Sequence, residues 1–119
     1  HMDNDFLEFI PGISSVQLMF ARLKKSWHDA LILSMHGRKA DGLAEQIKDA
    51  PVTALLTGEP WNPRQIARYL LENNMNDLKA AIGQNLSYDN ERIIFSSLQK
   101  IAEDNNNYDN SVMVIFNER

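Results

Sequence analysis

Apolar residues recur along the chain at the spacing of amphipathic helices. The first such stripe has four members at positions i, i+3, i+4 and i+7: Val16, Met19, Phe20 and Leu23. Ser14 and Gln17 stand at the start of this stripe with the Ser-x-x-Gln spacing of a capping box, which satisfies two free N–H groups at a helix start. The pattern therefore predicts a helix beginning at Ser14.

Three further helices are predicted from start and stop signals. A short helix over 42–48 has Asp41 in position to cap it. Asn62 followed by proline marks the start of a helix that ends near 73–74. The segment Ser96–Gln99 repeats the capping-box spacing, and it predicts a final helix from that point.

Short apolar runs between these helices are typical of strands. We expect five of them, over 30–36, 52–57, 79–84, 91–95 and 111–116, preceded by a short extended entry segment at 6–10. The order of elements is then α-β-α-β-α-β-β-α-β. Such alternation predicts an α/β fold with a mixed, mostly parallel sheet of about five strands and flanking helices, in which the β-β step forms an antiparallel pair.

Composition narrows the range of functions. The 119 residues are 44% hydrophobic and 24% charged, which predicts one globular domain. The net charge of −4 disfavours a nucleic-acid coat, and no apolar run approaches the ~18 residues needed to span a membrane. The absence of cysteine excludes disulfides, thiolate catalysis and cysteine-ligated zinc, and we expect a cytoplasmic protein.

The start of the chain indicates a piece of a longer protein. Residues 1–2, His-Met, are typical of the remnant left by tag removal, and they are excluded from the fold argument. The chain then enters Phe6–Ile13 with no starting strand and Gly-rich turn before it. We therefore expect a cut at a domain boundary.

Candidate chemistry lies at the ends of two predicted strands. His36, Gly37 and Arg38 directly follow the first strand, at the carboxyl edge where open α/β sheets bind ligands. Gly37 allows a close approach of the backbone, and Arg38 suits a carboxylate. Thr57 and Gly58 end the next strand, where a flat ring has room to lie against the backbone. A solvated turn is the alternative reading of both sites.

Other candidate positions are weaker when judged from spacing alone. The Pro-Gly turn at 11–12 precedes Ser14 and Ser15, where a helix start offers free N–H groups. His28 and His36 have no metal-ligand spacing, so we expect no metal site. The sequence has no Gly-x-Gly-x-x-Gly, phosphate-binding loop or nucleophile elbow. The residues alone thus indicate a soluble α/β domain without a defined activity.

Five segments resemble the tetrapyrrole methylases of cobalamin synthesis, and within that family the methyltransferases that act on carbon 5 of a precorrin. These segments are Ile10–Gln17, Phe20–Leu23, Trp27–Ala30, Ser34–Arg38 and Gly83–Ile93. They occur in the order and with the separation of the family. The similarity covers residues 5–116, and the Ser-x-His-Gly-Arg element is the most specific part.

The resemblance implies a two-domain α/β enzyme that transfers a methyl group from S-adenosylmethionine to a ring carbon of a corrin precursor. The cofactor is then expected in a cleft between the domains, with the tetrapyrrole in an adjoining trough. Residues 3–119 resemble the carboxyl-terminal domain with its linker. The amino-terminal domain, with its Gly-rich loop, is outside this sequence, so we expect the isolated fragment to be inactive.

Carried over by position, the resemblance implies cofactor contacts by five residues: Ser14, Ser15, Thr57, Asn85 and Leu86. Thr57 stands where relatives often have methionine before Gly58, so its backbone is the expected contact. His36 and Arg38 match the element that faces the trough. Arg38 suits the acidic side chains of a tetrapyrrole, and His36 is the candidate catalytic base.

The expected partners are the tetrapyrrole substrate, the chain's own amino-terminal domain, a second copy in a homodimer, and a fused or separate decarboxylase. No nucleic acid or membrane is expected. Two alternatives remain. One is a non-catalytic α/β module that binds a small ligand or a partner, and the other is a methylase of the same superfamily acting at another ring position. A Gly-rich methylase half encoded upstream favours an enzyme over the module.

Overall fold

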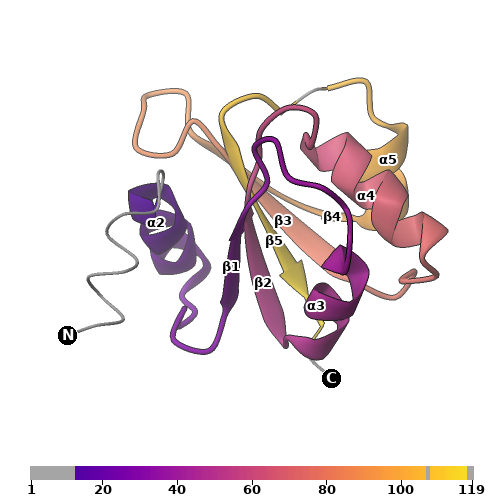
Figure 1. Cartoon of the computed structure of the whole chain (residues 1–119). Coiled ribbons are helices and arrows are strands. Elements are labelled where there is room, and N and C mark those ends of the chain that lie inside the picture. The colour runs from indigo at the N-terminus through magenta and orange to yellow at the C-terminus, as the bar shows by residue number, and fades with distance from the viewer. Residues whose placement is uncertain (1–12, 107, 118–119) are drawn as a thin grey trace.

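The computed structural model of the chain describes residues 13–106 and 108–117. Its helices are α2 (Ile13–Leu23), α3 (Leu43–Asp49), α4 (Pro63–Glu72) and α5 (Leu98–Glu103). Its strands are β1 (Leu31–Ser34), β2 (Val52–Leu56), β3 (Lys79–Gln84), β4 (Arg92–Ser97) and β5 (Ser111–Phe116) (Figure 1). The elements follow the predicted order. The extended segment and turn predicted at 6–12 lie outside the described residues.

The strands form one mixed sheet in the order β1-β2-β5-β3-β4. The prediction of a five-stranded mixed sheet with flanking helices is confirmed, and β3 and β4 form the expected antiparallel pair. The expectation that the sheet is mostly parallel is wrong. Only β1 and β2 pair in parallel, whereas β5 is antiparallel to both β2 and β3.

The helical connections between strands explain why the sheet is not mostly parallel. Helix α4 joins β2 to β3, and α5 joins β4 to β5; each of these pairs runs in one direction, as a helical crossover requires. However, each crossover skips one strand position, and an antiparallel strand fills the gap. Alternation of helices and strands specifies strand direction without specifying this insertion.

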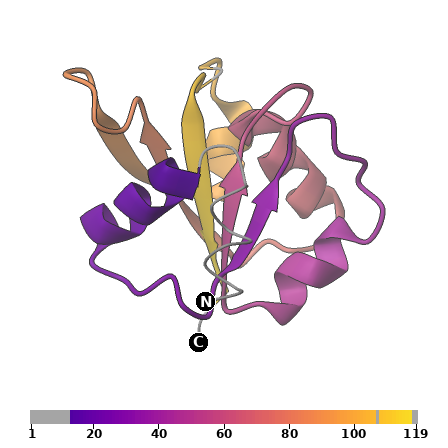
Figure 2. The same ribbon diagram turned by 60° about the vertical axis from the view of Figure 1, so that its left-hand side comes forward.

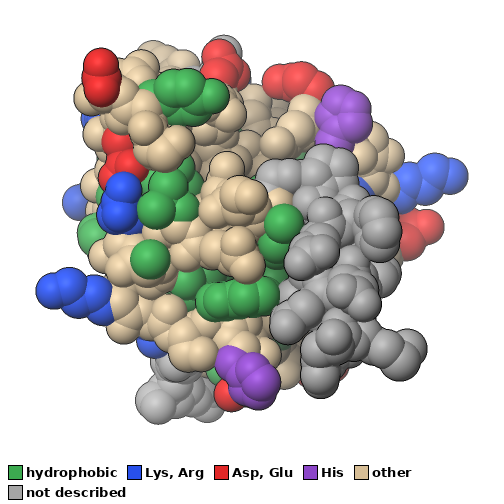
Figure 3. All heavy atoms as spheres, turned by 90° about the vertical axis from the view of Figure 1, so that its left-hand side faces the viewer, with side chains coloured by type: hydrophobic (Ala, Val, Ile, Leu, Met, Phe, Trp, Pro, Cys, Tyr) green, Lys and Arg blue, Asp and Glu red, His purple; other side chains and the backbone are tan. Residues whose placement is uncertain are grey.

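Helices cover the two faces of the sheet unequally. Helices α3, α4 and α5 lie on one face, and α2 lies alone on the other (Figures 1 and 2). Viewed from the α2 side, hydrophobic side chains reach the surface among polar ones (Figure 3). The predicted stripe of α2 packs against alternate residues of the central strands, as a half-buried helix should. This cluster includes Val16, Met19, Phe20, Ala54, Ala81, Val112 and Val114.

Two of the predicted helix starts are realised with a side-chain cap. The Asn62 side chain accepts the N–H of Gln65 at 2.9 Å, as expected for an Asn-Pro start. Helix α5 is capped by Ser97, which accepts the N–H of Lys100 at 3.3 Å. The predicted cap, Ser96, is one residue early because β4 continues through Ser97.

The other two helix starts differ from prediction. Helix α2 already includes Ile13, so Ser14 lies within its first turn and is not the capping residue. Helix α3 is preceded by Gly42 in the left-handed region, with φ of 74° and no side-chain cap, so Asp41 does not cap it. The first turn of α2 therefore contains both Ser14 and Ser15.

Candidate functional site

A cavity of about 410 Å³ lies at the edge of the sheet where β1, β2 and β3 end and β5 begins. Three strands of one direction bring their carboxyl ends to this edge, and the first turn of α2 closes one side. The cavity is lined by residues from all these elements and from the β3–β4 loop: Ser15, Ser34, His36, Leu56, Thr57, Gly83, Leu86, Ser87, Tyr88, Asn110, Ser111 and Val112.

The described part of the lining is polar. It includes several hydroxyls and an amide beside three aliphatic side chains, and among residues 13–106 and 108–117 no Lys, Arg, Asp or Glu lines the cavity. His36 is the residue of this lining that carries an imidazole. The cavity therefore suits a portion of a ligand that makes hydrogen bonds and stacks without carrying charge.

Backbone contacts hold the turn that carries His36. Beyond the end of β1, the N–H of Met35 donates to the carbonyl of Leu56 at 2.9 Å, which extends the pairing with β2. Gly37 then adopts a left-handed conformation with φ of 66°, and its N–H donates to the carbonyl of Glu59 at 3.1 Å. His36 is thus fixed at the carboxyl edge, with its side chain exposed.

Gly58 leaves space for the His36 side chain. A β-carbon at position 58 would lie 3.0 Å from Cβ and 3.1 Å from Nδ1 of His36. Contacts of this length are tighter than most that real β-carbons make, so a side chain at Gly58 would require His36 to move by a few tenths of an ångström. The prediction that a flat ring of a ligand lies against this backbone stays a prediction, and in the structure the His36 side chain lies beside Gly58.

Thr57 uses its side chain within the fold. Its hydroxyl donates to the carbonyl of Ser111 at 2.8 Å, and the two side-chain hydroxyl oxygens are also 2.8 Å apart. These contacts tie the end of β2 to the start of β5. The backbone of Thr57 remains the expected ligand contact, as the departure from methionine already indicated.

The β3–β4 loop forms the outer wall of the cavity. Asn85 and Ser87 adopt left-handed conformations, with φ of 53° and 72°. The N–H of Asn85 donates to the carbonyl of Asn110 at 3.1 Å, and the side-chain amide of Asn110 donates back to Asn85 at 3.2 Å. The wall is therefore bound to the loop that precedes β5.

An ion pair binds the same wall to α2. Nε of Arg22 donates to Glu91 at 2.9 Å, and Nη2 donates to the second carboxylate oxygen at 3.3 Å. Glu91 also accepts the N–H of Ser87 at 2.8 Å. These hydrogen bonds, that from Arg22 first, lower the pKa of Glu91, while Glu91 raises the pKa of Arg22. The anionic carboxylate thus holds loop and helix together.

The structure brings four of the predicted cofactor and substrate residues together in the cavity lining: Ser15, His36, Thr57 and Leu86. Two others lie beside it. Ser14 is exposed on the first turn of α2, and Asn85 is held against Asn110 behind the wall. Leu86 is buried against the α2 face of the sheet, so most of its surface serves the core.

Arg38 lies outside this lining. Its Nη2 donates to Gln46 of α3 at 3.1 Å, and its carbonyl accepts Nε1–H of Trp61 at 2.7 Å. The side chain is half-buried among these groups, and its Nε is buried without a hydrogen-bond partner. His36 and Arg38 therefore diverge from their shared turn, one toward the cavity and one toward α3.

Sequence reasoning missed eight of the lining residues: Ser34, Leu56, Gly83, Ser87, Tyr88, Asn110, Ser111 and Val112. Asn110 and Ser111 reach the cavity because β5 inserts beside β2, and nothing in the pattern of the chain predicts that insertion. Tyr88 had a usable signal. It is an aromatic residue in an otherwise polar loop, a position that normally disfavours a large ring unless something covers it.

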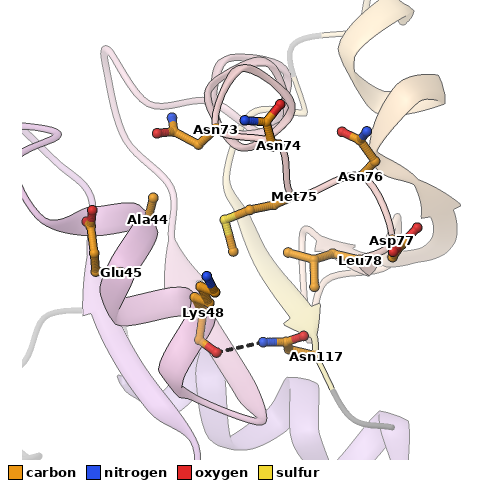
Figure 4. Close-up of a pocket in the computed structure, with 10 residues that line it drawn as sticks. All are labelled: Ala44, Glu45, Lys48, Asn73, Asn74, Met75, Asn76, Asp77, Leu78 and Asn117. Atoms are coloured by element: carbon orange, nitrogen blue, oxygen red, sulfur yellow. Dashed lines mark hydrogen bonds between the residues drawn. The ribbon is translucent and has the colours of Figure 1, made fainter.

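A larger cavity, of about 670 Å³, lies at the opposite edge of the sheet (Figure 4). It is bounded by α3, the α4–β3 loop and Asn117, whose side-chain amide donates to the carbonyl of Lys48 at 2.8 Å. Met75 and Leu78 contribute apolar surface among amide side chains. None of the predicted site residues lines it, so we place the candidate site at the carboxyl edge.

Over residues 13–106 and 108–117, no group of three or more His, Asp or Glu side chains is arranged to hold a metal ion. Among the helices of those same residues, none has the length and apolar character needed to cross a membrane.

Comparisons with known proteins agree with this geometry. The sequence profile of the tetrapyrrole (corrin/porphyrin) methylases matches residues 4–102. The chain is 37% identical over 105 residues to the probable cobalt-precorrin-7 C(5)-methyltransferase of Methanocaldococcus jannaschii, covering 86% of this chain and 48% of the relative. It is 32% identical over its full length to the cobalt-precorrin-7 C(5)-methyltransferase of Salmonella typhimurium, covering 57% of that protein.

Fold similarity points the same way. Uroporphyrin-III C-methyl transferase from Thermus thermophilus, solved as a complex with S-adenyl homocysteine, matches 75% of this chain and 40% of its own with a TM-score of 0.58 and 18% identity. The chain spans about half the length of the curated relatives it matches. Because the family profile covers most of the sequence and the fold agrees, the chain belongs to the tetrapyrrole methylase family.

Proposed function

We propose that this chain is the carboxyl-terminal domain of an S-adenosylmethionine-dependent methyltransferase that methylates carbon 5 of a precorrin in cobalamin biosynthesis. The names and identities of the two curated relatives support this assignment. Residues 3–119 form this domain, and a Gly-rich amino-terminal domain supplies the other wall of the cofactor cleft. Membership in the family favours this function over a non-catalytic binding module.

The uncharged lining of the carboxyl-edge cavity is the observation that carries the proposal. Its hydroxyl, amide and aliphatic groups suit the adenosine of S-adenosylmethionine, which is polar and uncharged. A tetrapyrrole with several carboxylates is less suited to it, because the described residues of the lining include no Lys or Arg. We therefore assign the cofactor to the cavity and the tetrapyrrole to the adjoining surface.

Each predicted site residue has a role in this arrangement. Ser15 offers its hydroxyl and N–H from the first turn of α2, and Ser14 lies beside it at the mouth. The backbone of Thr57 and the side chain of Leu86 contact the nucleoside. Asn85 fixes the wall through Asn110. When bound, S-adenosylmethionine supplies an electrophilic methyl group, so the protein contributes mainly alignment.

His36 is positioned to act on the substrate at the edge of the cavity. Its imidazole is exposed and lies against Gly58, and a neutral imidazole has one ring nitrogen that can accept a proton. We assign to His36 the role of the base that accepts the proton lost by the tetrapyrrole after methylation. Arg38, on the other side of Gly37, is assigned to a carboxylate of the tetrapyrrole, which would replace Gln46 as its hydrogen-bond partner.

The resemblance to the family also supports three broader assignments. We place the full-length enzyme in the cytoplasm and expect it to work as a homodimer. A decarboxylase that acts on the same precursor, fused or separate, is its expected partner. The precorrin remains the substrate class common to the relatives named above.

Cofactor binding by the full-length protein tests the proposal. Ser15→Leu should weaken binding of S-adenosylhomocysteine in calorimetry, because the larger side chain enters the cavity beside α2. Gln17→Leu is the matched control, since Gln17 is exposed on the same helix and does not line the cavity. Unchanged affinity in a folded Ser15→Leu protein would reject the cofactor assignment.

A further inference from the structure

Two large hydrophobic side chains are exposed in the described part of the chain, Tyr88 at 65% and Phe95 at 69%. Both belong to the β3–β4 hairpin, but only Tyr88 lines the candidate cofactor cavity. The ring of Tyr88 at this polar cavity is therefore largely uncovered by the described residues of the chain. A ring in this position is able to contact a ligand that occupies the cavity.

The backbone holds Tyr88 in place. Its N–H donates to the carbonyl of Asn85 at 3.0 Å, and its own carbonyl accepts the N–H of Glu91 at 3.0 Å. Tyr88 thus lies between two consecutive turns, and the Arg22–Glu91 ion pair fastens the second turn to α2. A ring on such an anchored loop loses little conformational entropy when a ligand packs against it.

The surroundings of Tyr88 select the chemistry of that ligand. A phenol ring stacks well on a flat conjugated ring, and the described lining residues beside it carry no full charge. Adenine is flat and uncharged, and it makes hydrogen bonds of the kind that Ser87 and Asn110 can match. A carboxylate-rich tetrapyrrole would find no Lys or Arg among these described residues.

We propose that Tyr88 is the stacking surface for the adenine of the methyl donor, and that it sets the affinity of this site for the cofactor. This inference rests on the function proposed above. It adds a binding residue that neither the strand-end pattern nor the carried-over positions assigned. The ring provides the contact, and the Glu91 ion pair positions the loop that carries it.

The test measures binding of S-adenosylhomocysteine to the full-length protein by calorimetry. Tyr88→Ala should weaken binding about tenfold, within the range measured for loss of one base–aromatic stack. Tyr88→Phe should remain within about twofold of the wild type, because the ring stays. Phe95→Ala is the matched control: it removes an equally exposed ring from the same hairpin, outside the cavity, and should leave affinity unchanged.

The outcomes separate this inference from the proposed function. Wild-type affinity in a folded Tyr88→Ala protein would overturn the stacking role and leave the proposed function intact. The same holds if Tyr88→Ala changes the KM of the tetrapyrrole at saturating cofactor while cofactor affinity stays constant. If the wild-type protein itself does not bind S-adenosylhomocysteine, the proposed function fails and the stacking role fails with it. Thermal unfolding of each variant reports its folding.

Discussion

Two glycines leave space for neighbouring side chains at the candidate site. Gly58 leaves the space against which His36 lies, and Gly83 leaves the space into which α2 packs Met19. Both glycines stand at the carboxyl edge of the sheet, where neighbouring elements meet most closely. Their backbones therefore allow His36 and Leu86, two residues of the candidate site, to lie where they do.

Gly83→Ala should destabilise the chain. A β-carbon there would lie 2.4 Å from Sδ of Met19 and 3.1 Å from a methyl carbon of Leu86. Met19 is fully buried, so the core must shift, at a cost of about 1–3 kcal/mol. Urea unfolding of the 119-residue chain measures the loss. Adding Met19→Ala should make the two changes less than additive, and full additivity would contradict the contact.

Arg38→Ala in the full-length enzyme should raise the KM of the tetrapyrrole and leave cofactor affinity intact. A hydrogen bond to a charged group contributes about 1.5–3 kcal/mol, which corresponds to roughly a 10- to 150-fold change. Steady-state kinetics at saturating S-adenosylmethionine provides the measurement. Gln46→Ala is the control, because it removes the present partner of Arg38 and leaves the guanidinium. A wild-type KM in Arg38→Ala would mean that Arg38 is a structural turn residue.

At the scale of elements, the helices and strands follow from apolar periodicity, because each buries one face or stripe. The position of β5 in the sheet does not follow from this periodicity, because Val112 and Val114 look the same in sequence whether β5 lies at an edge or at the centre. The residues that β5 brings to the candidate site were therefore not predictable either. Ser15 and His36 were predictable from local patterns, whereas Ser111 reaches the cavity only through the insertion of β5.

We expect Glu91, which anchors the β3–β4 loop, to make the free energy of unfolding depend on pH. The hydrogen bonds from Arg22 and from Ser87 hold the pKa of Glu91 below its ordinary value of 4.5. Because the folded pKa is the lower one, the stabilisation is complete above pH 4.5 and is lost as pH falls through the folded value. Glu91→Gln should therefore be less stable than the wild type at pH 7, with the difference shrinking in acid.

Urea unfolding between pH 7 and pH 3 measures this dependence, expressed as the difference between wild type and variant. Asp89→Asn is the matched control, since Asp89 is an exposed carboxylate of the same loop. Asp104 contributes a parallel acid dependence to both proteins, because the hydroxyl of Tyr108 lowers its pKa. A constant difference across the pH range would show that the charge of Glu91 has no part in holding the loop.

At the scale of the whole molecule, the proposed function makes the cavity one half of a cofactor cleft. Its described walls come from α2, the ends of three strands and the β3–β4 loop, and the chain spans about half the length of the relatives it matches. A ligand bound here alone would keep much of its surface in water, and methyl transfer needs the donor and the ring carbon held in one geometry. We expect a second domain to cover the ligand and to hold the methyl donor and the ring carbon in that geometry.

We therefore predict that the 119-residue chain transfers no methyl group to a precorrin by itself. Alignment of the two reactants is the main catalytic contribution available to such an enzyme, and half a cleft cannot exclude water or fix their relative orientation. The measurement is transfer of labelled methyl from S-adenosylmethionine to the tetrapyrrole, with the full-length protein as the positive control. Adding the separately produced amino-terminal half should restore part of the activity, and His36→Ala in the added carboxyl-terminal half should reduce what is restored. Turnover by the isolated chain at a rate near that of the full-length protein would show that this domain alone contains the complete active site.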